Sequence, residues 1–106
     1  MKYLASTFSP MMLDEKSWTN AEVVPIELND IPSAKELNSI VSHEITAKIL
    51  SALLNEIVEF NRINITLFAG DVMYCVIPGF RTTEAREFSY EEVAAAGWRC
   101  FLVTVN

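Results

Sequence analysis

The chain contains one histidine, and it is the side chain best suited to move a proton near neutral pH. His43 follows Ser42 at the start of residues 42–54, whose apolar residues recur at helical spacing, so we expect it in the first turn of a helix. A helix N-terminus disfavours the charged imidazolium, whereas a phosphate bound beside it favours that form. An anion that binds there could therefore favour the protonated form of His43, which can then donate a proton. A solvated histidine at a helix end is the plainer alternative.

Two arginines and a glutamate are the other candidates for phosphate chemistry. Glu84 lies in an aperiodic segment with Arg81, which could lower the pKa of Glu84 and also contact a phosphate. Arg62 follows Asn61 at the start of an expected strand, where its guanidinium could fork onto phosphate oxygens. Each of these charged side chains, taken singly, could equally be solvated surface.

Three hydroxyl groups stand at expected helix starts. Ser9 precedes Pro10 in an N-cap pattern, and Ser42 and Thr46 flank His43. Their simplest roles are caps and surface hydroxyls. The same hydroxyls, together with the N–H groups at a helix start, can also bind a phosphate.

Other classes of site are disfavoured. Cys75 and Cys100 lie in apolar, strand-like runs, which indicates buried thiols rather than a disulfide framework, although a disulfide is arithmetically possible. One histidine with scattered carboxylates and separated cysteines is a poor ligand set, so we predict no metal site, and we expect no cofactor. No glycine-rich phosphate loop is present.

Length and charge limit the classes of protein further. With 106 residues the chain has room for one domain, residues 1–106. A net charge of −6 argues against binding of long nucleic acids, but a few arginines and helix N-termini can still bind a small anion. Residues 49–58 are too short and too polar to span a membrane, and the N-terminal residues do not resemble a signal peptide. We therefore expect a cytoplasmic protein without membrane contact.

The hydrophobic pattern predicts an α+β domain with a mixed sheet of about five strands and packed helices. The expected strands are residues 2–7, 21–28, 62–68, 72–77 and 98–105, with Pro25 pushing the second toward a sheet edge. Strands 62–68 and 72–77 are expected to form a hairpin through residues 69–71. Helical segments are expected after Ser9, over residues 32–39 and 42–54, and from a capping box at Ser89 to Gly97.

Residues 39–54 read Ser-Ile-Val-Ser-His-Glu-Ile-Thr-Ala-Lys-Ile-Leu-Ser-Ala-Leu-Leu. This run resembles the S-x-I-G-H-x-x-T-A-x-x-L-S-x-L-L pattern of the viral type III anti-CRISPR ring nucleases. Further similar segments follow the family's order along nearly the whole chain: residues 3–9, Asn61-Arg62-Ile63, Gly70-Asp71, residues 81–85 and residues 89–92. Each motif alone is weak, but together and in order they are more specific.

The resemblance implies a homodimer that binds cyclic tetra-adenylate, the second messenger of type III CRISPR defence, across its two-fold axis. Family members cut this ring without a metal and so silence the effector that it activates. The catalytic pair that the resemblance implies is His43 and Glu84. The ligand-binding positions carried over, or lying beside the histidine, are Ser9, Ser42, Thr46, Arg62 and Arg81. If the protein is viral, it would act in the host cytoplasm.

Departures from the family pattern leave other functions open. Ser42 and Ala85 replace glycines, and Ser6 replaces an asparagine. A Cβ at both former glycine positions would reshape the pocket. A module that sequesters a cyclic nucleotide without cutting it is therefore the second hypothesis, and an interaction protein without a nucleotide ligand is the third.

Overall fold

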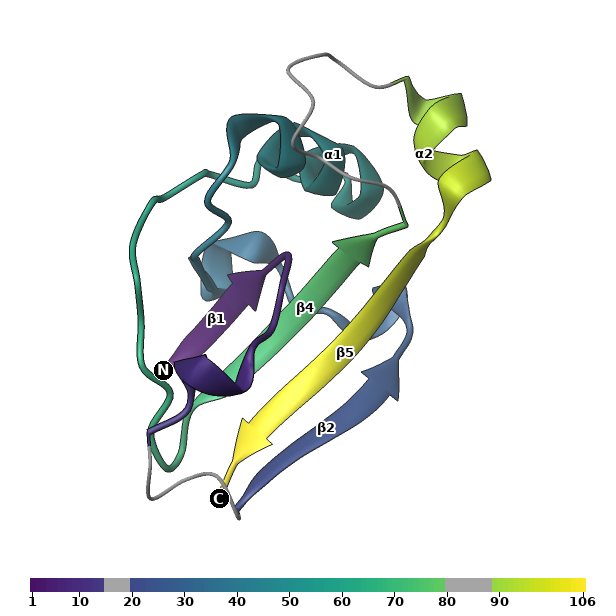
Figure 1. Cartoon of the computed structure of the whole chain (residues 1–106). Helices are drawn as coiled ribbons and strands as arrows, with labels where there is room; N and C mark the ends of the chain where they lie inside the picture. Colours follow the sequence, from purple (N-terminus) through teal and green to yellow (C-terminus); the bar gives the residue numbers. More distant parts are fainter. Residues whose placement is uncertain (15–19, 80–88) are drawn as a thin grey trace.

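A mixed five-stranded sheet lies at the centre of the computed structural model, which describes residues 1–14, 20–79 and 89–106 (Figure 1). The strands are β1 (Lys2–Ala5), β2 (Ala21–Ile26), β3 (Asn38–Ser39), β4 (Val72–Pro78) and β5 (Trp98–Val105). Their order across the sheet is β2-β5-β4-β1-β3. β1 pairs in parallel with β3 and β4, whereas β5 pairs antiparallel with β4 and β2. The predicted α+β class is confirmed, and Pro25 does lie in an edge strand.

Two α-helices are described, α1 (Glu44–Leu54) and α2 (Tyr90–Ala96), together with the 3₁₀ turns η1 (Pro10–Met12), η3 (Leu28–Asp30) and η4 (Ala34–Glu36). α1 stops at Asn55, whose φ of 54° is the left-handed conformation expected there. α2 begins with the predicted capping box, in which Ser89 and Glu92 each accept the other's backbone N–H. None of these helices has the length and apolarity needed to cross a membrane.

Side chains from successive strand residues fill two separate cores on opposite faces of the sheet. The first core joins Leu4 and Val76 of the sheet to Leu50 of α1. The second core packs Met73 and Val103 under residues of η1 and under Leu67. Figure 1 shows η1 in front of the sheet, so the second core lies on the face toward the viewer.

Both cysteines are buried free thiols, as the sequence indicated. Cys100 pairs with Val76 in the β4–β5 ladder, and Cys75 precedes Val76, so the two thiols project from opposite faces of the sheet. Burial, with a smaller contribution from Cys100, raises the pKa of Cys75 to about 12. A disulfide between them would require one side chain to leave its core.

The predicted hairpin was wrong. Residues 62–68 form no ladder; Leu67 alone makes a parallel bridge, to Leu13. Leu67 is fully buried against the front of the sheet and Ile65 packs partly against the same core, while Ile63 is 52% exposed. The alternation therefore marks side chains that pack on the sheet rather than a strand within it. The turn itself was correct, because Asp71 accepts the N–H of Phe68 at 2.9 Å and Gly70 has a φ of 91°. The chain leaves this turn to enter β4 between β1 and β5.

The helix predicted over residues 32–39 was also largely wrong. Only Ala34–Glu36 is helical, and Asn38–Ser39 forms β3 beside β1. Leu37 packs into the first core and Ile40 into the second. Such alternation has a period near two rather than 3.6, and it lets this short segment complete the edge of the sheet.

The carboxylate of Glu56 joins the end of α1 to η4. It accepts the hydroxyl of Ser33 at 2.6 Å and the N–H of Ala34 at 3.0 Å. These two hydrogen bonds, helped by Lys35 and opposed by partial burial, lower the pKa of Glu56 below its ordinary 4.5. Because the folded-state pKa is lowered, the stabilisation is present above the unfolded-state pKa and is lost as pH falls through the folded value.

We therefore expect Glu56→Gln to destabilise the fold at pH 7 and to have a smaller effect at an acidic pH below the lowered folded-state pKa, where the wild-type carboxyl is also protonated. Urea unfolding of both proteins at the two pH values measures the difference. Glu36→Gln removes an exposed carboxylate of η4 and is the control. An effect of Glu56→Gln that is equal at both pH values would contradict the ionised hydrogen bonds.

Gly79 lies where the end of β4 meets the end of α2. Its N–H donates to the carbonyl of Gly97 at 2.9 Å, and a Cβ built on it would lie 2.3 Å from the carbonyl oxygen of Ala96. That oxygen belongs to the backbone and cannot rotate away. Gly79→Ala should therefore lower the free energy of unfolding by about 1–3 kcal/mol, measured by urea denaturation. An unchanged midpoint would mean that α2 does not pack here as described.

Candidate functional site

His43 is the N-cap residue of α1, one position before the first helical turn in which it was expected. Its backbone is extended (φ −122°, ψ 134°), and its carbonyl accepts the N–H of Ala47 at 3.0 Å. The exposed imidazole makes no capping hydrogen bond to the helix. The first N–H groups of α1 have no intrahelical acceptors, so the helix presents donors beside the imidazole.

Thr46 adds a buried hydroxyl to the first turn of α1. The residue is 1% exposed, and within the described part of the chain its Oγ1 has no hydrogen-bond partner. Leaving such a group unsatisfied costs about 1–3 kcal/mol. Ser42, just before the histidine, is half-buried and donates only a long 3.4 Å bond to the carbonyl of Ile40. The Ser42 hydroxyl is thus accessible to a ligand at this helix start, whereas the Thr46 hydroxyl is enclosed.

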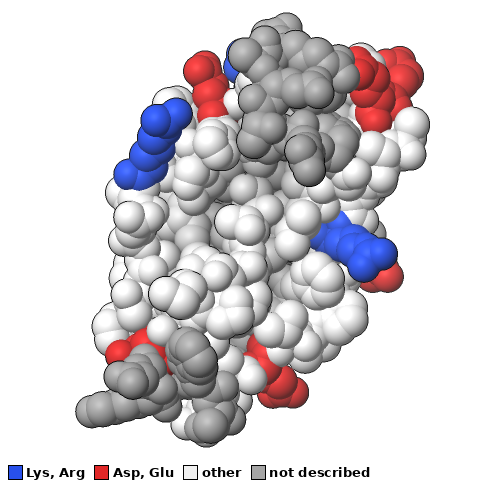
Figure 2. All heavy atoms as spheres, viewed as in Figure 1, with Lys and Arg blue, Asp and Glu red and all other residues white. Residues whose placement is uncertain are grey.

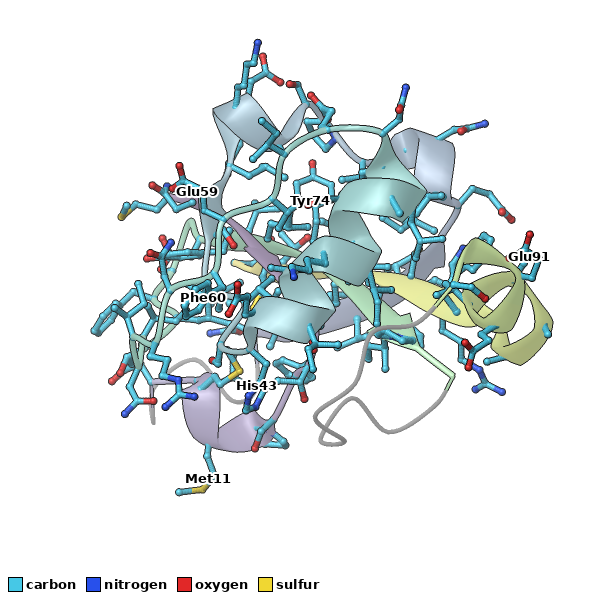
Figure 3. The ribbon with its side chains drawn as sticks, turned by 90° about the horizontal axis from the view of Figure 1, so that it is seen from above. Met11, His43, Glu59, Phe60, Tyr74 and Glu91 are labelled. Atoms are coloured by element: carbon cyan, nitrogen blue, oxygen red, sulfur yellow. The ribbon has the colours of Figure 1, made fainter. Side chains whose placement is uncertain are left out.

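Arg62 lies against the same helix start. Its Nε donates to the carbonyl of Ser42 at 3.3 Å, and its side chain is exposed. Because Arg62 bonds Ser42 and Ser42 precedes His43, a guanidinium, an imidazole and the helix N–H groups occur within one small region. Figure 3 shows His43 at this start of α1. This combination of groups can bind a phosphate and deliver a proton to it.

Ser9 is not brought to this region within one chain. It caps η1, where its Oγ accepts the N–H of Met11 at 3.3 Å. Figure 3 shows Met11 and His43 on the same side of the molecule, but Figure 1 places η1 well below α1 along the sheet. A shared ligand would have to extend down this face or receive Ser9 from a second copy.

Arg81 and Glu84 lie outside the described residues. Their predicted roles therefore remain predictions. The described half of the site, namely His43 with Ser42, Thr46 and Arg62, comes entirely from α1 and the two segments beside its start.

Comparison with known proteins places the chain in a family of similar fold. A family model described as STIV B116-like matches residues 2–100. The chain belongs to this family. B116 of Sulfolobus turreted icosahedral virus is similar in structure, with a TM-score of 0.77 and 18% sequence identity over 97% of each chain. That identity shows the fold alone, and neither description names an activity. No curated protein sequence matched.

Two residues of this STIV B116-like chain that sequence reasoning did not assign to the site hold the segment before His43. Asn61 donates its side-chain amide to the carbonyl of Ser39 at 2.9 Å and its backbone N–H to Val41 at 2.7 Å. The hydroxyl of Ser39 donates to the carbonyl of Glu59 at 2.5 Å. These bonds join residues about 20 positions apart. The only sequence signal was the position of Asn61 next to Arg62.

The face on which His43 lies carries little charge at its centre. Figure 2 shows this face with white, uncharged atoms over most of the middle and with blue and red groups toward its margins. The net charge of −6 is therefore not concentrated over the visible centre of this face.

A cavity of about 580 Å³ occurs at the opposite end of α1, away from His43. Its lining includes Asn55, Glu56, Glu59 and Lys35. The C-terminal end of a helix and two carboxylates disfavour a phosphate. An anion is therefore better accommodated at the start of α1 than in this cavity.

Proposed function

We propose that this chain is a metal-independent ring nuclease that binds and cleaves cyclic tetra-adenylate and so counters type III CRISPR signalling. The observation that carries the proposal is the exposed His43 at the start of α1, whose imidazole makes no capping hydrogen bond and which lies beside Arg62. The identity of the proposed ligand comes from the sequence resemblance to viral ring nucleases. The same resemblance also implies the host cytoplasm as the place of action.

In this proposal a phosphate of the ring binds at the N–H groups of α1, with Arg62 and Arg81 on its oxygens. The neighbouring 2′-hydroxyl attacks the phosphorus, and the bond from phosphorus to the 5′-oxygen breaks. The products are a 2′,3′-cyclic phosphate and a 5′-hydroxyl. Holding the three reacting atoms in line lowers the barrier, and the cationic groups stabilise the charge that develops on the phosphate.

His43 in its protonated form gives its proton to the departing 5′-oxygen. General acid catalysis of this kind contributes roughly 10²–10⁴-fold. Glu84 either accepts the proton of the 2′-hydroxyl or orients His43, and the proposal holds with either role. Ser9 completes the set as a contact to a more distant part of the ring.

We propose further that two copies form the active protein. A ring of four equal units suits a two-fold symmetric site, because an isologous interface presents each group twice. Two features support the uncharged centre of the front face as the contact surface. Val23 of the edge strand is 47% exposed, and few charged groups lie near the middle of this face (Figure 2). A second copy would also bring another Ser9 to the ligand.

One observation favours a non-cleaving cyclic-nucleotide sponge as the second candidate. Ser42 stands where the ring-nuclease pattern has glycine, and its half-buried side chain lies directly before His43. A Cβ there limits how closely the backbone can approach a phosphate. A ring held slightly out of line would be bound but cut slowly.

The test is incubation of the purified protein with labelled cyclic tetra-adenylate in EDTA, followed by denaturation and separation of the products. Linear di-adenylate with a cyclic phosphate end supports the nuclease. Intact ring that is released only on denaturation supports the sponge. No retention of the ring contradicts both and favours an interaction protein.

A further inference from the structure

Four hydrogen bonds join the connector between β3 and α1 to an irregular segment that follows α1. We call them the connector clamp. Its bonds are Ser39 Oγ to Glu59 O (2.5 Å), Asn61 N to Val41 O (2.7 Å), Asn61 Nδ2 to Ser39 O (2.9 Å) and Arg62 Nε to Ser42 O (3.3 Å). Neither side of the clamp belongs to a regular ladder beyond Ser39.

The connector is the shorter of the two covalent links between the sheet and His43, because the other runs through α1 and residues 55–71 to β4. Residues 40–42 lie between β3 and the N-cap, and they have no regular secondary structure. Ile40 and Val41 are buried in opposite cores, which fixes where the connector passes through the edge of the sheet. The direction in which the chain then enters α1 depends on the groups that hold the carbonyls of Ser39, Val41 and Ser42.

Asn61 holds two of these three carbonyls. Its half-buried side-chain amide and its backbone N–H bind the connector on either side of Ile40. The third carbonyl, that of Ser42, is held by the next residue, Arg62, through a longer and exposed bond. Because Arg62 follows Asn61 directly, the backbone conformation at Asn61 also determines the position from which the Arg62 side chain extends.

We propose that Asn61 is the positioning residue of this site. Its amide fixes the angle at which α1 leaves the sheet and hence the place of His43 relative to a bound phosphate. This inference rests on the proposed ring-nuclease function, and Asn61 itself touches neither the ligand nor the reacting atoms. Because a misplacement of about 1 Å can cost on the order of 10²-fold in rate, loss of the amide should slow cutting more than it weakens binding.

The test uses the full chain with Asn61→Leu, which keeps the approximate shape of the side chain and removes its donor. Asn61→Ala, which adds no bulk, is made in parallel in case the leucine disturbs folding. The matched control is Asn38→Leu. It also removes a side-chain amide that donates to a backbone carbonyl, that of Lys2 at 3.1 Å, but this bond lies outside the clamp.

Single-turnover cutting and equilibrium binding of labelled cyclic tetra-adenylate are measured for each variant. We expect the Asn61 variants to cut about 10- to 100-fold more slowly with affinity changed less than about threefold, and Asn38→Leu to cut at nearly the wild-type rate. Equal losses in the Asn61 and Asn38 variants, or a loss of affinity that matches the loss of rate, would reduce the role of Asn61 to general stability and overturn the proposal.

A second readout separates this inference from the proposed function. Residual dipolar couplings of the N–H groups in α1, β4 and β5, measured without ligand, report the orientation of α1 relative to the two strands. The Asn61 variants should reorient α1, and Asn38→Leu should not. If the wild-type protein neither binds nor cuts the ring, the proposed function fails. The couplings still test whether the Asn61 amide sets the orientation of α1. An unchanged helix orientation in both Asn61 variants would overturn the positioning role.

Discussion

Replacing His43 with alanine is expected to slow the cutting of cyclic tetra-adenylate by at least about two orders of magnitude and to leave its affinity nearly unchanged. The imidazole is exposed and makes no capping bond to α1, so the fold does not depend on it. In the proposed reaction it supplies a proton only as the bond to the 5′-oxygen breaks. Its removal therefore raises the barrier without removing an anchor for the bound ring.

His43→Asn is the matched control for folding. Asparagine is among the best N-cap residues, and replacing a residue that does not cap the helix with one that can should preserve or raise stability. The amide cannot donate a proton as an acid does near neutral pH, so cutting should fall as it does in His43→Ala. Single-turnover rates and Kd values for both variants decide the matter. Wild-type turnover in either one would overturn the role of His43.

Local signals in the sequence predicted both of the described α-helices, α1 and α2. Asn55 ends α1 because its short polar side chain tolerates a φ of 54°, and Ser89 begins α2 because its hydroxyl accepts a helix N–H. Such signals act over a few residues and can be read without knowing what lies nearby in space. The predicted starts and stops therefore agree with the structure to within about two residues.

Pairing over long distances could not be read in the same way. Residues 62–68 alternate as a strand does, yet Leu67 packs on the front of the sheet and β4 pairs with β1 and β5. An apolar alternation states which side chains are buried and does not name the partner strand. The same limit applies to Asn38–Ser39, where two residues pair with β1 and no pattern of useful length exists.

The candidate site shows the same division between local and distant information. The types of His43 and Thr46, together with their helical spacing, indicated one helix start, and the structure has them there. Arg62 became part of this region only through its bond to Ser42, 20 residues earlier. The role of Asn61 depends on two such distant bonds, so hydrogen-bond geometry was needed to find it.

The second large effect is expected for Arg62→Ala, which should weaken binding of cyclic tetra-adenylate by about 10- to 100-fold. A hydrogen bond to a charged group contributes about 1.5–3 kcal/mol, and each 1.4 kcal/mol is a tenfold change in Kd. Arg62 is exposed, with its Nε on Ser42, so its outer nitrogens can meet phosphate oxygens. Cutting of ring that is already bound should fall less than in His43→Ala, because an anchor is lost and the acid remains.

Two variants separate a specific contact from a simple change in charge. Arg62→Lys keeps the positive charge but cannot form a forked pair of hydrogen bonds, so it should recover only part of the affinity. Arg99→Ala removes the same side chain from the surface of β5 and should change Kd by less than about twofold, since exposed charges beyond a Debye length of about 8 Å are largely screened at physiological salt. If Arg99→Ala weakened binding as much as Arg62→Ala, the attraction would come from overall charge. That result would contradict a phosphate site at the start of α1.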